Sequence, residues 1–308
     1  MIFRKVMSLL LTAVLFVSSM TMAAAAAPDT VQGKLSMIEK DTYGTEQTGA
    51  VLERINKLET DYNGSHMAGS MMARVDAIYD QLYSNGAAPS LLAQVNAVEW
   101  NIYREVSMTP VDQRIANLEL EIAGKTEKGS FVQRITGLSE LSFGNASIPM
   151  VQTMVPANTL VKIALVTPVN AKNLKAGDTI RYKVAADVFV DGNLVFAKGE
   201  PGIGTVQKVT QAKNFGRNAE VEIDFAKTKA IDGTDVETFL GEESKQEMKN
   251  MAMAAGASVA GMVLLGPIGI VAGAFVKGKN VDVPEGTEMF IQTKADTALY
   301  GVQSGAMK

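Results

Sequence analysis

The 308-residue chain contains no cysteine and only one histidine. Without cysteine there are no disulfides, no thiolate metal sites and no cysteine nucleophile, and the chain lacks the lipid-attachment cysteine of a bacterial lipoprotein. His66 lies in a glycine-rich turn without neighbouring ligands, so we expect a surface loop residue and not a metal site. No histidine remains for a serine triad. We therefore predict no catalytic residue, no cofactor and no enzymatic activity.

Basic residues are also few, and they form no cluster. The chain has 29 lysines and arginines against 33 aspartates and glutamates, a net charge of −4. Nucleic-acid binding therefore has no electrostatic basis. A phosphate-binding loop is equally absent: the glycine-rich segment 199–204 lacks the required lysine and precedes a predicted strand, so we interpret it as a turn.

The first 26 residues have the order of a secretory signal peptide. Arg4 and Lys5 precede an apolar run over residues 6–20, and an alanine-rich zone follows at 23–27. An uncleaved membrane anchor is the alternative, but the apolar run is short for a span. We predict that residues 1–26 are a signal peptide. The mature protein is then exported, to the periplasm or the outer envelope.

Apolar residues recur every 20 positions between residues 31 and 144. Each anchor is followed by a second aliphatic residue three positions later, and glycine, proline and serine stand at fixed places between anchors. This pattern predicts six helices of roughly 12 to 15 residues joined by short turns. Twenty is not a multiple of seven, so one unbroken coiled coil is not expected. The anchors are Leu35, Ile55, Val75, Val95, Ile115 and Ile135.

Charges flank these apolar positions in a regular way. In most repeats a basic residue precedes the anchor and a glutamate follows it by four, which are the g and e positions of a heptad. Parallel helices pair g with e′, which would join Arg54 to Glu59 of another chain. The segments 54–59 and 114–119 also resemble the short arginine-to-glutamate motif of parallel trimeric coiled coils. The predicted oligomer or repeat-interface residues are Arg54, Ile55, Leu58, Glu59, Arg114, Ile115, Leu118 and Glu119.

Two arrangements of the repeats stay open. One is an intrachain array of short helices, stacked as a solenoid or bundle. It is favoured by apolar residues beside the seam, such as Leu52 and Met72, which widen the apolar stripe. The other is a parallel homo-oligomeric stalk, for which the arginine-to-glutamate motif indicates a trimer. Trp100 is either an exposed contact residue or buried between repeats.

After Asn145 the helical period gives way to β-branched runs, glycine turns and proline starts. We predict a small β-barrel or sandwich over residues 150–300, with hairpin turns at Asp191-Gly192 and Asp232-Gly233. The segment starting Val155-Pro is echoed by the one starting Val283-Pro, which suggests that the domain opens and closes with equivalent strands. The fold class is therefore α+β.

This half of the chain resembles a known family. The order Val155-Pro-Ala-Asn-Thr, Ala176-Gly-Asp, Asp187-Val-Phe-Val-Asp-Gly, Phe196-Ala-Lys-Gly, Phe215-Gly-Arg and Ala230-Ile-Asp-Gly is similar to the β-barrel domain of TrbI-like conjugal transfer proteins. Those proteins are outer-membrane-core components of type IV secretion systems. The chain looks closer still to a class of uncharacterised exported bacterial proteins in which this pattern precedes a glycine-rich apolar stretch. The resemblance implies a barrel, with a channel component as the alternative function.

An uncharged, glycine-rich segment interrupts the β domain at residues 251–276. Ala257 with Gly261, and Gly269 with Gly273, have the spacing that lets helix backbones pack closely, as in a glycine zipper. Gly266-Pro267 would break one long helix into two arms. The segment is then either membrane-associated or a helix pair packed on the barrel. In TrbI-like proteins an insertion at this place reaches the outer membrane.

These features together predict a non-enzymatic bacterial cell-envelope protein that acts as a spacer, scaffold or anchor. Its expected partners are a component of the cell envelope or the outer membrane, and further copies of itself. The alternative is a TrbI-like component of a secretion or conjugation channel at the outer membrane.

Overall fold

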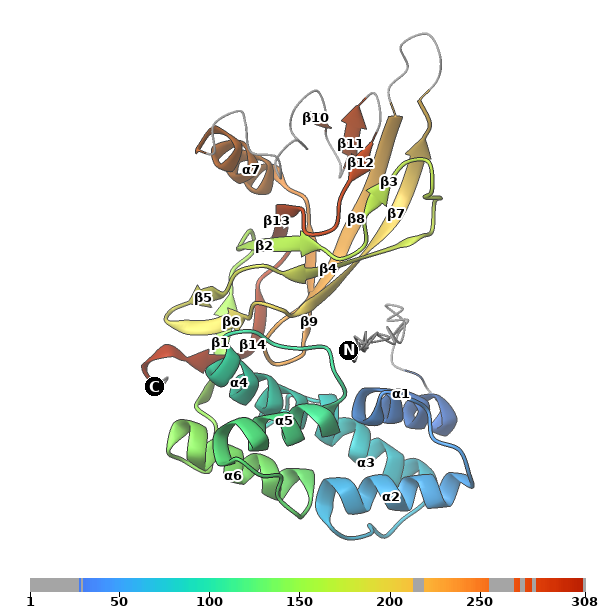
Figure 1. Ribbon diagram of the computed structural model, residues 1–308, viewed down its shortest axis with the longest axis vertical. Coiled ribbons are helices and arrows are strands. Elements are labelled where there is room, and N and C mark those ends of the chain that lie inside the picture. The colour runs from blue at the N-terminus through green and yellow to red at the C-terminus, as the bar shows by residue number, and fades with distance from the viewer. Residues whose placement is uncertain are drawn as a thin grey trace, which may run out of the picture.

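The computed structural model describes residue 28 and residues 30–212, 219–254, 269–271, 275–278 and 281–306. The predicted signal peptide and most of the predicted apolar insert lie outside these residues. Within them, a helical array is followed by an antiparallel β domain, so the predicted α+β fold is confirmed (Figure 1).

Six helices of 13 residues each begin at the same point of the 20-residue repeat. Serine or threonine caps several N-termini, as Ser130 does by accepting from the backbone N–H of Gln133. Glycine in the left-handed conformation ends four of the helices, and each helix is about 20 Å long. The helices are α1 (Val31–Tyr43), α2 (Val51–Asn63), α3 (Met71–Tyr83), α4 (Leu91–Tyr103), α5 (Val111–Ala123) and α6 (Phe131–Phe143).

The first three helices run parallel around an approximate threefold axis. Near their C-termini, equivalent residues form a closed cycle of side-chain hydrogen bonds from α1 to α2, from α2 to α3 and from α3 back to α1. Because equivalent ends meet, the helices are parallel. We call α1–α3 the first triplet and α4–α6 the second triplet. The bonded pairs are Tyr43 with Asp61, Asn63 with Gln81, and Tyr83 with Asp41.

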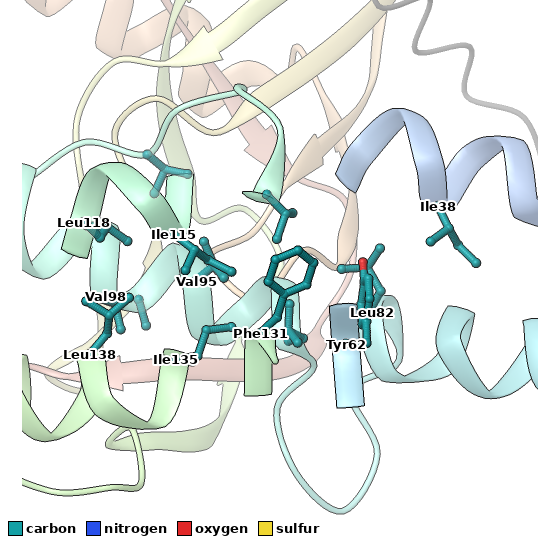
Figure 2. Packing of buried hydrophobic residues seen from close by; sticks show 14 of the residues in the cluster. Ile38, Tyr62, Leu82, Val95, Val98, Ile115, Leu118, Phe131, Ile135 and Leu138 are labelled. Carbon is teal, nitrogen blue, oxygen red and sulfur yellow. The ribbon is translucent and has the colours of Figure 1, made fainter. Parts of the chain in front are cut away.

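The second triplet stacks head-to-tail on the first. The rings of Tyr62, at the end of α2, and Phe131, at the start of α6, meet edge-to-face with centroids 5.3 Å apart. A Cβ atom at Gly44, after α1, would lie 2.9 Å from Cγ of Pro110, before α5. Figure 2 shows Phe131 lying between residues of the two triplets. We call this contact between the triplets the inner joint.

All six anchors are buried in one hydrophobic core that runs through both triplets. The repeats therefore close on themselves as an intrachain bundle. A homo-oligomeric stalk would need other chains to bury the apolar seam. Here the seam is buried within one chain.

The β domain is built around a closed six-stranded antiparallel barrel. Strand β8 pairs with β7 on one side and with β9 on the other, which closes the order β8-β7-β4-β2-β13-β9. Strands such as β2 alternate buried and half-buried residues, as expected when one face lines a core. A second sheet has the order β1-β14-β6-β5. The strands are β1 (Met150–Val155), β2 (Leu160–Leu165), β3 (Val169–Asn170), β4 (Thr179–Val184), β5 (Val188–Val190), β6 (Asn193–Phe196), β7 (Pro201–Thr210), β8 (Ala219–Lys229), β9 (Asp235–Phe239), β10 (Gly269–Val271), β11 (Phe275–Gly278), β12 (Asp282–Val283), β13 (Glu288–Thr293) and β14 (Thr297–Gln303).

The two Val-Pro segments form matching turns before neighbouring strands. Thr159 N–H donates to the carbonyl of Pro156 before β2, and Thr287 N–H donates to that of Pro284 before β13. Strands β2 and β13 are antiparallel partners. The sequence echo thus marks two adjacent barrel strands. It does not mark the ends of the domain, which are formed by the paired strands β1 and β14.

The apolar insert differs from the predicted helix pair where it is described. Helix α7 (Glu242–Ala254) includes the first four residues of the insert, and Gly269 is the first residue of strand β10, which pairs with β11. Ala257, Gly261 and Gly273 lie outside the described residues. No helix within the described ranges is long and apolar enough to cross a membrane.

Candidate functional site

Four buried glutamates hold successive helices together. Glu59, for example, accepts from Arg74 Nε at 2.7 Å and from the backbone N–H of Met67 at 3.2 Å. One carboxylate thus binds the connecting loop and the next helix, and we call each such unit a clamp. The same pattern of a glutamate, a backbone N–H eight residues later and an arginine fifteen residues later recurs at Glu39, Glu99 and Glu119.

The clamps contain the arginines and glutamates that the sequence predicted to pair between chains. Arg54 binds Glu39, whereas Glu59 binds Arg74, all within one chain. The g-to-e geometry is that of parallel helices, but the partner comes from the neighbouring repeat and not from another molecule. Arg114 likewise binds Glu99, and Glu119 binds Arg134. The remaining predicted interface residues, Ile55, Leu58, Ile115 and Leu118, are buried in the core.

The clamp is missing only between α3 and α4 among the five connections. Tyr79 stands where a glutamate is expected and Gln94 where an arginine is expected. Here the chain steps from one triplet to the next instead of returning beside the preceding helix, so the two residues have no reason to meet. Lys34 of α1 closes the first triplet instead, with its Nζ 2.6 Å from Asp76 and 5.2 Å from the Tyr79 ring centroid. The simultaneous loss of the glutamate and the arginine is therefore a sequence signal for the place where the chain passes from the first triplet to the second.

Helix α4 joins the array to the β domain, and we call this contact the junction. Unlike the other helices it buries residues on all sides. Trp100 is 3% exposed, and its Nε1 donates to Asp187 at 3.0 Å. In the following loop, Val106 N–H donates to the carbonyl of Lys198, and Glu105 binds the side chains of Lys183 and Lys198. Figure 1 shows the β domain lying beside the array, with α4 close to it.

A buried polar chain crosses the junction. Arg114 Nη2 donates to Asn96 Oδ1 at 2.6 Å, and Asn96 Nδ2 donates to Glu200 Oε1 at 3.0 Å. Asn96 also donates to the carbonyl of Ile231. Glu200 is 2% exposed, and its burial raises its pKa to about 8. Sequence reasoning missed Glu200 because it lies in a segment that is indistinguishable from an ordinary turn.

An open groove of about 660 Å³ runs along the junction between α4, α5 and the barrel. Three large apolar side chains on its walls are exposed, namely Tyr103 (44%), Met108 (45%) and Leu120 (52%). Glu121 and Lys183 also line it. Exposed apolar area with a polar rim is typical of a surface that binds a protein segment. Among the described residues, no three acidic or histidine side chains are grouped so that they could hold a metal ion.

No family model and no curated protein matches the chain. Among solved structures, the chain is similar to ComB10 of the Com type IV secretion system of Helicobacter pylori. The identity is 17% and the TM-score 0.26, over 46% of this chain and 88% of that chain. A similarity this distant carries no assignment of function.

We expect Gly199→Ala to weaken the junction. Gly199 has a φ of 96°, and an added Cβ would collide with the carbonyl oxygen of Val106. Gly124→Ala is the matched control, because Gly124 has a φ of 70° and no atom in the part of the chain that the structure describes lies within 4 Å of its Cβ position. Both variants carry the left-handed strain of about 1 to 2 kcal/mol, and overpacking adds about 1 to 3 kcal/mol at Gly199 alone. Urea denaturation measures the difference, and equal losses would contradict the close approach.

Proposed function

We propose that the protein is a non-enzymatic scaffold of the bacterial cell envelope that holds its helical array and its β-barrel in one fixed relative position. The observation that carries this proposal is the junction, where α4 belongs to the core of the array and also packs on the β domain. Leu194, Ala197, Ile231 and Val302 of the β domain share the hydrophobic cluster of the array.

Separating the two parts would be costly. It would expose apolar surface around Trp100 and Val106, which is unfavourable by about 25 cal/mol per Å². It would also break the hydrogen bonds of Asn96 to Glu200 and Ile231, which are buried in the joined form. Two domains that move independently about a hinge are instead expected to share a small, polar and hydrated interface. The junction therefore supports a rigid platform, with the open groove beside it as the place where a partner segment binds.

The rigidity can be measured directly, because the chain has no cysteine to interfere with labelling. Spin labels at Lys57→Cys in the array and Lys294→Cys in the β domain occupy exposed positions. Pulsed electron resonance is expected to give one narrow distance distribution. Asn96→Ala is expected to broaden it, while the groove variant Asn117→Ala leaves it unchanged. A broad distribution in the parent protein would refute a fixed platform.

The envelope location rests on the signal-peptide pattern of residues 1–26, and anchoring rests on the apolar segment 251–276. An alkaline phosphatase fusion to the full chain is expected to be active, and the same fusion without residues 1–26 inactive. Membrane fractionation of the full chain and of a variant lacking residues 255–268 tests anchoring. Identical partitioning of the two would argue against a membrane contact by this segment.

A role as a channel component is the second candidate, and the place of the insert favours it. The chain leaves the barrel after β9, forms α7, and returns through β11, which pairs with β8 of the barrel. The TrbI-like resemblance implies a helical insertion from the barrel at this place. Co-purification with transfer ATPases or other channel proteins from the source bacterium would support this role. Purification without any of them would count against it.

A further inference from the structure

The repeat allows equivalent positions in the two triplets to be compared directly. Four residues before each anchor, the second triplet has Leu91, Val111 and Phe131, which are 3%, 2% and 5% exposed. They are buried at the inner joint, where the C-terminal ends of the first triplet cover them. The structure thus shows what covers such a face: the C-terminal end of a triplet built from the same repeat.

The first triplet carries the equivalent positions at the other end of the array, and there they are more exposed. Met71 at the equivalent position is 49% exposed, and Val31 and Val51 are half-buried. The neighbouring Leu52 and Met72 are 48% and 40% exposed. We call these five residues the leading face. Its exposed side chains come from α2 and α3, and α1 adds the half-buried Val31. The equivalents of Val31, Val51 and Met71 are the residues that the inner joint buries.

The opposite end of the array is the complementary surface. At the inner joint Tyr62 and Leu82, seven residues after their anchors, are fully buried. Their equivalents in the second triplet, Ile102 and Ile122, are only half-buried. We call Ile102, Ile122 and Ala123 the trailing face. No atom of the described residues lies within 4 Å of a Cβ placed at Gly124, whereas a Cβ at the equivalent Gly64 would lie 3.8 Å from Cβ of Ser130.

We propose that the leading face of one molecule stacks on the trailing face of a second copy of the same chain, which repeats the inner joint between molecules. Such stacking buries the exposed apolar residues of both ends. It also places the negative C-terminal ends of one set of parallel helices against the positive N-terminal ends of another. The contact joins two different surfaces at opposite ends of the array, so repeated stacking builds a linear head-to-tail assembly. This assembly is independent of the rigid junction.

Two variants with blocked ends test the proposal. Met71→Glu places a charge on the leading face, and Ala123→Glu places one on the trailing face, both at exposed positions. Sedimentation velocity of the purified protein is expected to show a mass that rises with concentration. Each variant alone is expected to lose self-association by at least about tenfold, because burying an unpaired charge is unfavourable. A mixture of the two variants should form one-to-one dimers and nothing larger.

The mixture is decisive, because each variant keeps the one face that the other lacks. Val132→Glu is the control, since Val132 is 41% exposed and lies beside the inner joint, away from both ends. It should associate like the parent protein. A parent protein that stays monomeric at every concentration would overturn the proposal. So would a mixture that fails to dimerise, or an Ala123→Glu variant that still dimerises through two leading faces.

Discussion

Replacing Glu59 by alanine will lower the free energy of unfolding by about 3 to 5 kcal/mol, because it removes one partner of a buried ion pair. Glu59 is fully buried and Arg74 is 9% exposed. The variant leaves the Arg74 guanidinium without its carboxylate, and the backbone N–H of Met67 without an acceptor. Urea denaturation followed by far-UV circular dichroism measures the loss. Glu53→Ala, at an exposed position of the same helix, should change stability by less than about 0.5 kcal/mol.

The clamp also allows a compensating variant. Glu59→Gln with Arg74→Gln removes both charges of the clamp and keeps a side-chain amide at each position, so the two glutamines can still hydrogen-bond between α2 and α3. This double variant should recover part of the loss, because no unpaired charge remains buried. A loss below about 1 kcal/mol in Glu59→Ala would show that the clamp is not a main source of stability.

The clamp also has an expected pH dependence. Burial alone would raise the pKa of Glu59, but the hydrogen bonds from Arg74 and Met67 outweigh it, and the net pKa is lowered. A carboxyl with a lowered folded pKa contributes fully above its unfolded pKa and loses that contribution as the pH falls through the folded value. The difference in free energy of unfolding between the parent protein and Glu59→Ala should therefore become smaller as the pH is lowered.

Glu200→Gln is expected to act in the opposite direction and to stabilise the protein in mild alkali. Burial raises the pKa of Glu200 to about 8, although Arg114 and Lys229 lower it in part. The folded protein thus keeps a proton that the unfolded chain releases near the ordinary carboxyl pKa of about 4.3. The contribution of Glu200 to the free energy of unfolding is complete below the unfolded pKa. Above it, the contribution falls by about 1.4 kcal/mol per pH unit until the pH passes the folded pKa. Glutamine does not titrate, and its Oε1 still accepts from Asn96.

The measurement is the free energy of unfolding at several pH values between 5 and 9. The parent protein and Glu200→Gln should be similar at the acid end and differ by several kcal/mol at the alkaline end, with the variant more stable. Glu242→Gln, at a solvent-exposed glutamate, is the matched control and should follow the parent protein. Parallel curves for the parent and Glu200→Gln would show that Glu200 is not the group that titrates.

Much of the array could be predicted from the sequence, because its local signals agree. The apolar spacing, the capping serines and the left-handed glycines all indicate one helix in each repeat, and each helix is found. The parallel pairing of charges was also readable. What the charges could not say is which chain supplies the partner, since Arg54 has the same geometry toward Glu39 of its own chain as toward a neighbour. One signal does indicate that the three partners belong to one chain. The glutamate and the arginine are both replaced, by Tyr79 and Gln94, where the third helix completes the first triplet.

The β domain was less readable. The hairpin turns at Asp191 and Gly233 were identified because both positions need a positive φ, and both have one. The pairing of strands β1 and β14 joins residues about 150 positions apart, so it leaves no local pattern from which it could be predicted. The contact between Glu200 and Asn96 across the junction could not be predicted either, because the two residues are also far apart in the sequence. Their contact depends on how α4 packs on the barrel, which no periodicity records.

The pseudo-threefold array also has a consequence for how the surface can change. In a homotrimer every substitution appears three times, so a residue that suits one partner must be tolerated in all three subunits. Here each helix has its own sequence. Trp100 occurs once, on the helix that meets the β domain, while the equivalent positions of the other five helices hold Lys40, Thr60, Asp80, Leu120 and Glu140. Asn96 has an equivalent in Asn56, which also accepts from an arginine, but Asn96 alone of the two contacts the β domain in the part of the chain that the structure describes. The covalent connection of the helices therefore permits an asymmetric surface on a symmetric core.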